Sequence, residues 1–151
     1  MGFPHLPSTM AAVEAIRAVA REYGVAMTVT DDIGADQTSR RITVGTLGVQ
    51  DPDGSLPHEA YVELSGSPVV TVQIFPEDDA TIIVDDVEFP DIPRDHVPSF
   101  LRSVYSGLAY VEGKMFPPSL RLVVPLPGDE TYAEPVLRLT LTPWLTRNAR
   151  K

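Results

Sequence analysis

Three strands are predicted between residues 59 and 87, and the first two alternate apolar and polar side chains. They span residues 59–65, 68–75 and 81–87, and only a few residues separate one from the next. Side chains that alternate with a period of two belong to strands that bury one face. Short links between such strands are typical of hairpins. This region therefore predicts an antiparallel meander.

A helix is expected before the meander. Ser8 or Thr9 supplies its N-cap, and apolar residues then recur at helical spacing from Val13 to Tyr23. Gly24 follows directly, and a glycine in this position is the usual end of a helix because it adopts a left-handed conformation at low cost. The alanines on this segment allow it to pack closely on a sheet.

A second helix is expected after the meander. Its apolar stripe begins at Val97 and ends at Leu108, and Asp95 is expected to be its N-cap or an anion in its first turn. Further strands are predicted at residues 25–30, 40–49, 120–126 and 136–142.

The predicted order is thus one helix, five strands, a second helix and two strands. Because the helices do not alternate with the strands, the expected class is α+β, with a single twisted antiparallel sheet of about seven strands and two helices packed on one face. The chain of 151 residues has no repeat or linker, so we expect one domain over residues 1–151. Residues 1–6 and 146–151 are expected to be flexible tails.

Composition excludes several functional classes. The chain has no cysteine, which rules out disulfides, thiolate metal sites and a cysteine nucleophile. The net charge of −9 opposes binding to nucleic acid. No apolar run is long enough to cross a membrane, and the first residues lack a signal-peptide pattern. These features predict a cytoplasmic protein, and ten arginines against two lysines indicate a GC-rich bacterial genome.

Neither a metal site nor a catalytic site is predicted. His5, His58 and His96 lack the spacing of zinc ligands, and Asp51 and Asp53 read as part of a turn. Asp95, His96 and a nearby serine, Ser99 or Ser103, hold the residue types of a catalytic triad, but no nucleophile elbow accompanies them. No glycine-rich phosphate loop is present. We therefore expect no catalytic residue, no metal and no cofactor.

The segment FPEDDATIIVDDVEFPDIPRDH, residues 75–96, is the most acidic part of the chain. It holds eight of the 21 carboxylates and one arginine, Arg94. Such a run is either a solvated surface or a face that attracts a basic protein. The carboxylates expected to contact a partner are Glu77, Asp78, Asp79, Asp85, Asp86, Glu88 and Asp91.

Two aromatic regions are also notable. The loop YVEGKMFPP, residues 110–118, carries Met115 and Phe116 among prolines, and these two side chains are possible apolar anchors for a partner. Trp144 follows the last predicted strand and is expected to close the end of the core.

In size, element order and acidic balance, and in the segment FPEDDATIIVDDVEFPDIPRDH, the chain resembles the immunity proteins of polymorphic toxin systems. The resemblance involves no motif, so no residue role is transferred. It implies a small cytosolic bacterial protein that binds and blocks a basic toxin domain and has no enzymatic activity. The alternatives are a dimeric secretion chaperone or adaptor, and a small-anion-binding domain that uses Arg121 and Arg138. The sequence leaves open whether the protein is a monomer or a dimer.

Overall fold

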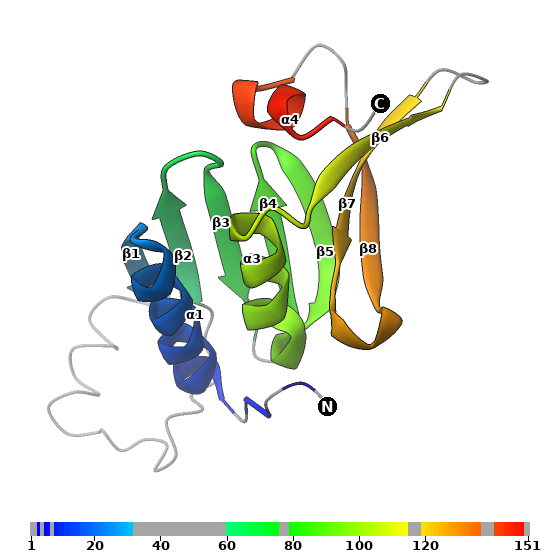
Figure 1. Ribbon diagram of the computed structural model, residues 1–151. Helices are drawn as coiled ribbons and strands as arrows, with labels where there is room; N and C mark the ends of the chain where they lie inside the picture. Colours follow the sequence, from blue (N-terminus) through cyan, green and yellow to red (C-terminus); the bar gives the residue numbers. More distant parts are fainter. Residues whose placement is uncertain are drawn as a thin grey trace, which may run out of the picture.

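The computed structural model describes residues 3, 5–6, 8–31, 60–75, 79–114, 119–136 and 141–149. These residues form an α+β fold with two antiparallel sheets, one of five strands and one of three (Figure 1). The predicted fold class is confirmed, but the expectation of a single sheet is wrong. The strand predicted at residues 40–49 lies outside the described residues.

The first helix, α1, spans Thr9–Tyr23 and begins and ends as the sequence predicts. The hydroxyl of Ser8 accepts a hydrogen bond of 3.0 Å from the backbone N–H of Ala11, which satisfies one of the free donors at the helix start. Gly24 has a φ of 66°, and its backbone N–H donates to carbonyls in the last turn of the helix. The residues that α1 buries include Ala12, Val13, Ile16, Val19 and Ala20.

The five-stranded sheet is a meander in which each strand pairs with the next along the chain. Its strands are β1 Ala26–Asp31, β2 Ala60–Ser65, β3 Val70–Ile74, β4 Asp79–Val84 and β5 Val87–Pro93. On β2, β3 and β4 the buried and more exposed positions alternate. The predicted alternation is therefore confirmed, and it places one row of apolar side chains in the core.

The stretch predicted as one strand at residues 81–87 is interrupted. Val84 pairs with Val87, so Asp85 and Asp86 form a two-residue turn between β4 and β5. Their φ angles are 46° and 73°, the left-handed conformation that a tight hairpin requires at both central positions. Aspartate adopts this conformation more readily than most residues. As a consequence, β5 occupies residues that were expected to lead into the second helix.

The second sheet consists of β6 Tyr110–Lys114, β7 Ser119–Pro125 and β8 Thr131–Val136. The region of β6 was expected to be a loop, and β8 lies before the predicted strand at residues 136–142. A short helix η3, Pro127–Asp129, connects β7 to β8. The chain then forms α4, Pro143–Arg147, which was not predicted.

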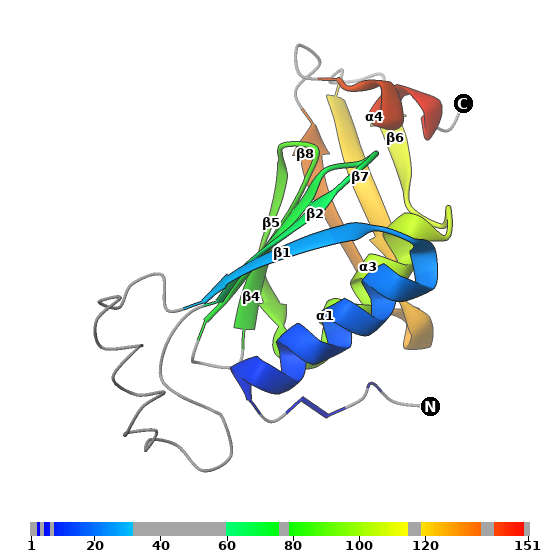
Figure 2. The same cartoon turned by 90° about the vertical axis from the view of Figure 1, so that its left-hand side faces the viewer.

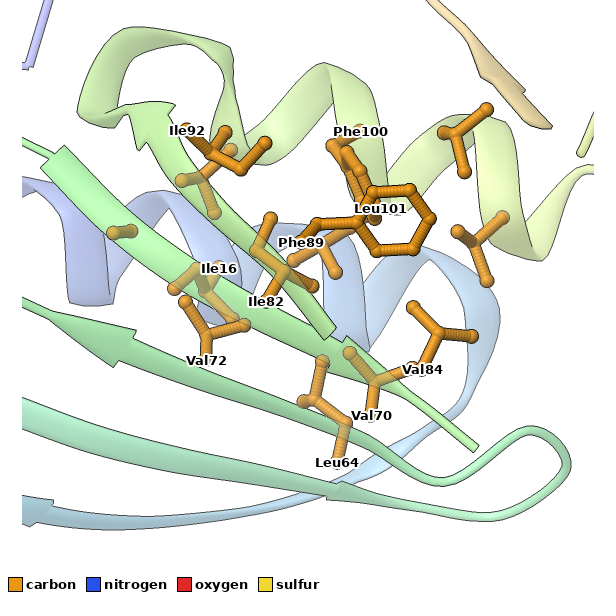
Figure 3. Packing of buried hydrophobic residues seen from close by; sticks show 14 of the residues in the cluster. Ile16, Leu64, Val70, Val72, Ile82, Val84, Phe89, Ile92, Phe100 and Leu101 are labelled. Atoms are coloured by element: carbon orange, nitrogen blue, oxygen red, sulfur yellow. The ribbon is translucent and has the colours of Figure 1, made fainter. Parts of the chain in front are cut away.

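Both longer helices lie on the same face of the five-stranded sheet (Figure 2). The second, α3, spans Val97–Tyr105 and follows a single turn of 3-10 helix, η2, at Arg94–His96. Beneath the helices lies the core, in which the rings of Phe89 and Phe100 meet edge to face at 5.0 Å (Figure 3). Trp144 is 6% exposed and belongs to this core, which confirms the role expected for it.

Candidate protein-binding face

In the part of the chain that the structure describes, α1 and α3 cover one face of the five-stranded sheet and leave the opposite face open (Figure 2). One row across this face follows from the strand register: Thr28, Glu63, Thr71, Ile83 and Glu88 are each paired with the next. Directly paired residues point to the same side of a sheet. All five are exposed or half-exposed, whereas their neighbours along the strands are more buried.

Glu63 and Glu88 lie in this row with two strands between them. Three strand spacings separate them, which corresponds to about 14 Å. Thr71 and Ile83 occupy the positions between the two carboxylates, so a partly apolar stretch separates them. A second row adds Tyr61, which pairs with Thr30 and Gln73.

The five strands contain five carboxylates and no lysine or arginine. The arginines that the structure describes lie on other elements, for example Arg17 and Arg21 on α1 and Arg102 on α3. Three of the strand carboxylates, Glu63, Glu88 and Asp91, are exposed. This separation of charge gives the sheet a negative field that its own strands do not neutralise.

The carboxylates predicted to contact a partner do not form one cluster. Asp79 begins β4 and pairs with Pro93, while Asp86 lies in the turn at the opposite end of that strand. Glu88 lies on the open face. Asp91 is exposed and has a φ of 58°. It lies in a β-bulge of β5, where the register shifts between the pairs Ile82–Phe89 and Ala80–Ile92.

Asp85 has a structural role that the sequence did not predict. Its carboxylate accepts a hydrogen bond of 2.8 Å from the backbone N–H of Val69, in the turn between β2 and β3. The second carboxylate oxygen accepts one from the hydroxyl of Thr142, the N-cap of α4. Asp85 therefore connects two turns and a helix, and its carboxylate is engaged inside the protein.

Glu77, Asp78, Met115 and Phe116 lie outside the described residues. Their assignment as partner contacts stays a prediction. Conversely, sequence reasoning did not select Glu63. Its outward position on β2 was recognisable from the alternation, but its place in a row with Glu88 depends on how the strands pair.

The residues considered for a catalytic triad do not bond to one another in the described structure. Asp95 is not the N-cap of α3, which is His96, but it lies in the first turn of η2. Its carboxylate accepts a hydrogen bond of 2.7 Å from the backbone N–H of Leu6 and lies 3.4 Å from His5. His96 shares a hydrogen bond of 2.7 Å between its Nδ1 and the Tyr132 hydroxyl. The hydroxyl of Ser103 is buried and has no hydrogen-bond partner. His58 lies outside the described residues.

Two further findings concern ions and membranes. In the described ranges, no three histidine, aspartate or glutamate side chains lie close enough to hold a metal ion. No helix among those residues is long and apolar enough to cross a membrane.

Arg121 was considered as part of an anion site. It donates to Glu112, directly opposite on β6, at 2.7 Å. The carboxylate from a neighbouring strand thus compensates this charge, which weakens the case for an anion at that position. Arg138 lies outside the described residues.

Burial raises the pKa of two tyrosine hydroxyls. The pKa of Tyr105 is raised well above its usual value, mainly because the ring is desolvated and also because Asp85 is negatively charged. Its hydroxyl is buried and has no hydrogen-bond partner. The pKa of Tyr132 is also raised, first by burial and then by the charge of Glu130.

A cavity of about 350 Å³ opens between α3 and η3. Leu108, which is 59% exposed, lines it together with Leu126 and two prolines. The surface inside the cavity is mostly apolar, although Arg102 and three serines of α3 and its C-cap also line it.

Comparison with family models, with curated proteins and with solved structures found no match. Any proposal about function therefore depends on the residues and their arrangement alone.

Proposed function

We propose that the protein binds and neutralises a basic protein partner, as an immunity protein binds its cognate toxin, and that the open face of the five-stranded sheet makes the contact. The observation that carries this proposal is the charge distribution on the five strands, which contain five carboxylates and no lysine or arginine. A surface of one sign on a rigid sheet accelerates the approach of an oppositely charged partner.

The face also offers more than charge. Tyr61 and Ile83 are half-exposed on it, and aromatic or aliphatic side chains of this kind form the dry centre of an interface. Glu63 and Glu88 would pair with lysines or arginines about 14 Å apart on the partner. Asp91 and Asp86 extend the negative surface along β5 and its turn.

The assignment of residues differs in one respect from that based on sequence. Asp85 is replaced by Glu63, because the Asp85 carboxylate already binds Val69 and Thr142. Glu77, Asp78, Asp79, Met115 and Phe116 remain proposed contacts. We expect no bond to be made or broken in the partner, since the face provides recognition alone.

The test is affinity purification from cells of the native host, followed by mass spectrometry and by an activity assay of the captured protein. The bait is either the wild-type chain or a variant with Glu63→Gln, Glu88→Gln and Asp91→Asn. A matched control removes the same charge elsewhere, through Glu14→Gln, Asp129→Asn and Glu130→Gln, all at exposed positions.

The proposal predicts that a basic protein is captured by the wild-type chain and by the control but is lost from the variant of the open face. The bound chain should also inhibit the activity of its partner. Capture of a basic partner to the same extent by all three baits would contradict the proposal, and so would a specific partner with an acidic surface.

A further inference from the structure

Arg94 and Asp95 hold the backbone of Leu6 from both sides. The backbone N–H of Leu6 donates to Asp95 Oδ1 at 2.7 Å, and Arg94 Nε donates to the Leu6 carbonyl at 2.9 Å. These side chains belong to consecutive residues on η2, whereas Leu6 lies almost 90 positions earlier in the chain. In a β-sheet, the backbone of a neighbouring strand would bond to these two groups, whereas here two side chains do so.

The local sequence explains why side chains take this role. β5 ends at Pro93, which has no backbone N–H to offer to a neighbouring segment. Arg94 is only 6% exposed, so its position is fixed by the surrounding protein. The pair therefore forms a clamp with one acceptor and one donor, matched to the backbone of a single residue.

Two further contacts involve side chains of the N-terminal residues. The side chain of Leu6 is 7% exposed and joins the core. Three residues earlier, the ring of Phe3 lies 3.9 Å from the ring of His96, measured between centroids. These contacts hold Phe3 and Leu6, two of the residues expected to belong to a flexible tail, against η2.

We propose that the Arg94–Asp95 clamp is a binding site for an extended peptide that carries an aromatic residue and, three positions later, a leucine. In the isolated chain, the N-terminal segment with Phe3 and Leu6 occupies this site as a tethered ligand. A partner segment with the same spacing would bind by displacing it. This inference is independent of the open face of the sheet.

The experiment uses the full chain with Phe3→Ala and Leu6→Ala, which removes both side-chain contacts of the tethered segment. Binding of a fluorescently labelled peptide with the sequence of residues 1–7, MGFPHLP, is measured by anisotropy at peptide-receptor concentrations up to about 1 mM. The same peptide with alanine in place of its leucine is the ligand control. The receptor control adds Asp95→Ala to the double variant.

We expect saturable binding to the double variant. Loss of a buried leucine from the peptide should weaken binding by about tenfold or more, and the Asp95→Ala control should show a comparable loss. The wild-type chain should also bind at least about tenfold more weakly, because its own segment competes.

A folded double variant without saturable binding would overturn the proposal. Equal binding by the wild-type chain and the double variant would overturn it as well, since the peptide would then occupy another place. If circular dichroism shows that the double variant is unfolded, the Phe3→Ala single variant, which keeps the buried leucine, is measured with the same peptides. Its failure to bind the labelled peptide more tightly than the wild-type chain does is then the contradicting result.

Discussion

The hydroxyl of Thr142 donates a hydrogen bond to the carboxylate of Asp85, 57 positions earlier in the chain. The same hydroxyl accepts a hydrogen bond of 3.2 Å from the backbone N–H of Leu145, so it caps α4 while it binds the β4–β5 turn. Asp85 in turn holds Val69 at 2.8 Å. One carboxylate thus joins the turns at one end of the five-stranded sheet to the C-terminal helix.

Replacement of Asp85 by alanine should therefore destabilise the protein much more than replacement of Asp86. Both variants place alanine in a left-handed conformation, which costs about 1 kcal/mol in each. Only Asp85→Ala also removes hydrogen bonds to a charged acceptor, which adds about 2 kcal/mol. Chemical denaturation measures the difference in the free energy of unfolding. Equal losses in the two variants would show that the Asp85 contacts contribute nothing to stability.

The conformation of Asp86 leads to a second prediction. Its φ of 73° is one that glycine adopts without steric cost, and its side chain is exposed. Asp86→Gly should leave the fold intact and raise the free energy of unfolding by up to about 1 kcal/mol. The control is Asp86→Asn, which removes the charge but keeps a side chain that tolerates the left-handed conformation. Stabilisation of similar size in both variants would assign the effect to charge and not to backbone strain.

The turn at Asp85 and Asp86 also shows where prediction from sequence reached its limit. Period-two alternation located β2 and β3 correctly, and a serine cap with a glycine stop located α1, because these signals are local. The sequence VDDV contains no glycine, asparagine or proline, so it read as a continuous strand. At Asp85 the positive φ angle accompanies a hydrogen bond with Thr142, which lies far away in sequence.

Similar reasons explain the errors in the second sheet and in the binding face. β6 contains Gly113 and β8 contains Pro135, and both residue types weaken a strand assignment. The strands form because each pairs with β7, a tertiary effect. Glu63 was recognisable as an outward residue, but only strand pairing places it in a row with Glu88.

A third prediction concerns the charge on the open face in the absence of any partner. Glu63→Gln together with Glu88→Gln should change the free energy of unfolding by less than about 0.5 kcal/mol at physiological salt, because exposed side chains contribute little to packing. At low ionic strength the variant should be slightly more stable than the wild-type chain, since self-repulsion of negative charge is then poorly screened. Denaturation across a range of salt concentrations measures this difference. A variant that is less stable at every salt concentration would indicate that these glutamates have structural contacts.

The fourth prediction compares two tyrosine hydroxyls. Tyr105 has a buried hydroxyl without a hydrogen-bond partner, whereas the Tyr132 hydroxyl is bonded to His96 at 2.7 Å. Removing an unpaired polar group from a buried site should be neutral or stabilising, by up to about 1 kcal/mol for Tyr105→Phe. Tyr132→Phe should instead destabilise by about 1 kcal/mol, because it leaves the histidine without that bond.

The same comparison has a pH dependence. Burial raises the pKa of Tyr105 in the folded state above the value of about 10 that the unfolded chain has, so the folded protein keeps the proton more tightly. This contribution to stability is fully present below pH 10 and is lost as the pH rises above it. The free energy of unfolding of the wild-type chain should therefore fall as the pH rises above about 10. In Tyr105→Phe this fall should be less steep. Unfolding curves at several alkaline pH values test this, and equal slopes for the two proteins would mean that Tyr105 ionises as freely in the folded state as in the unfolded one.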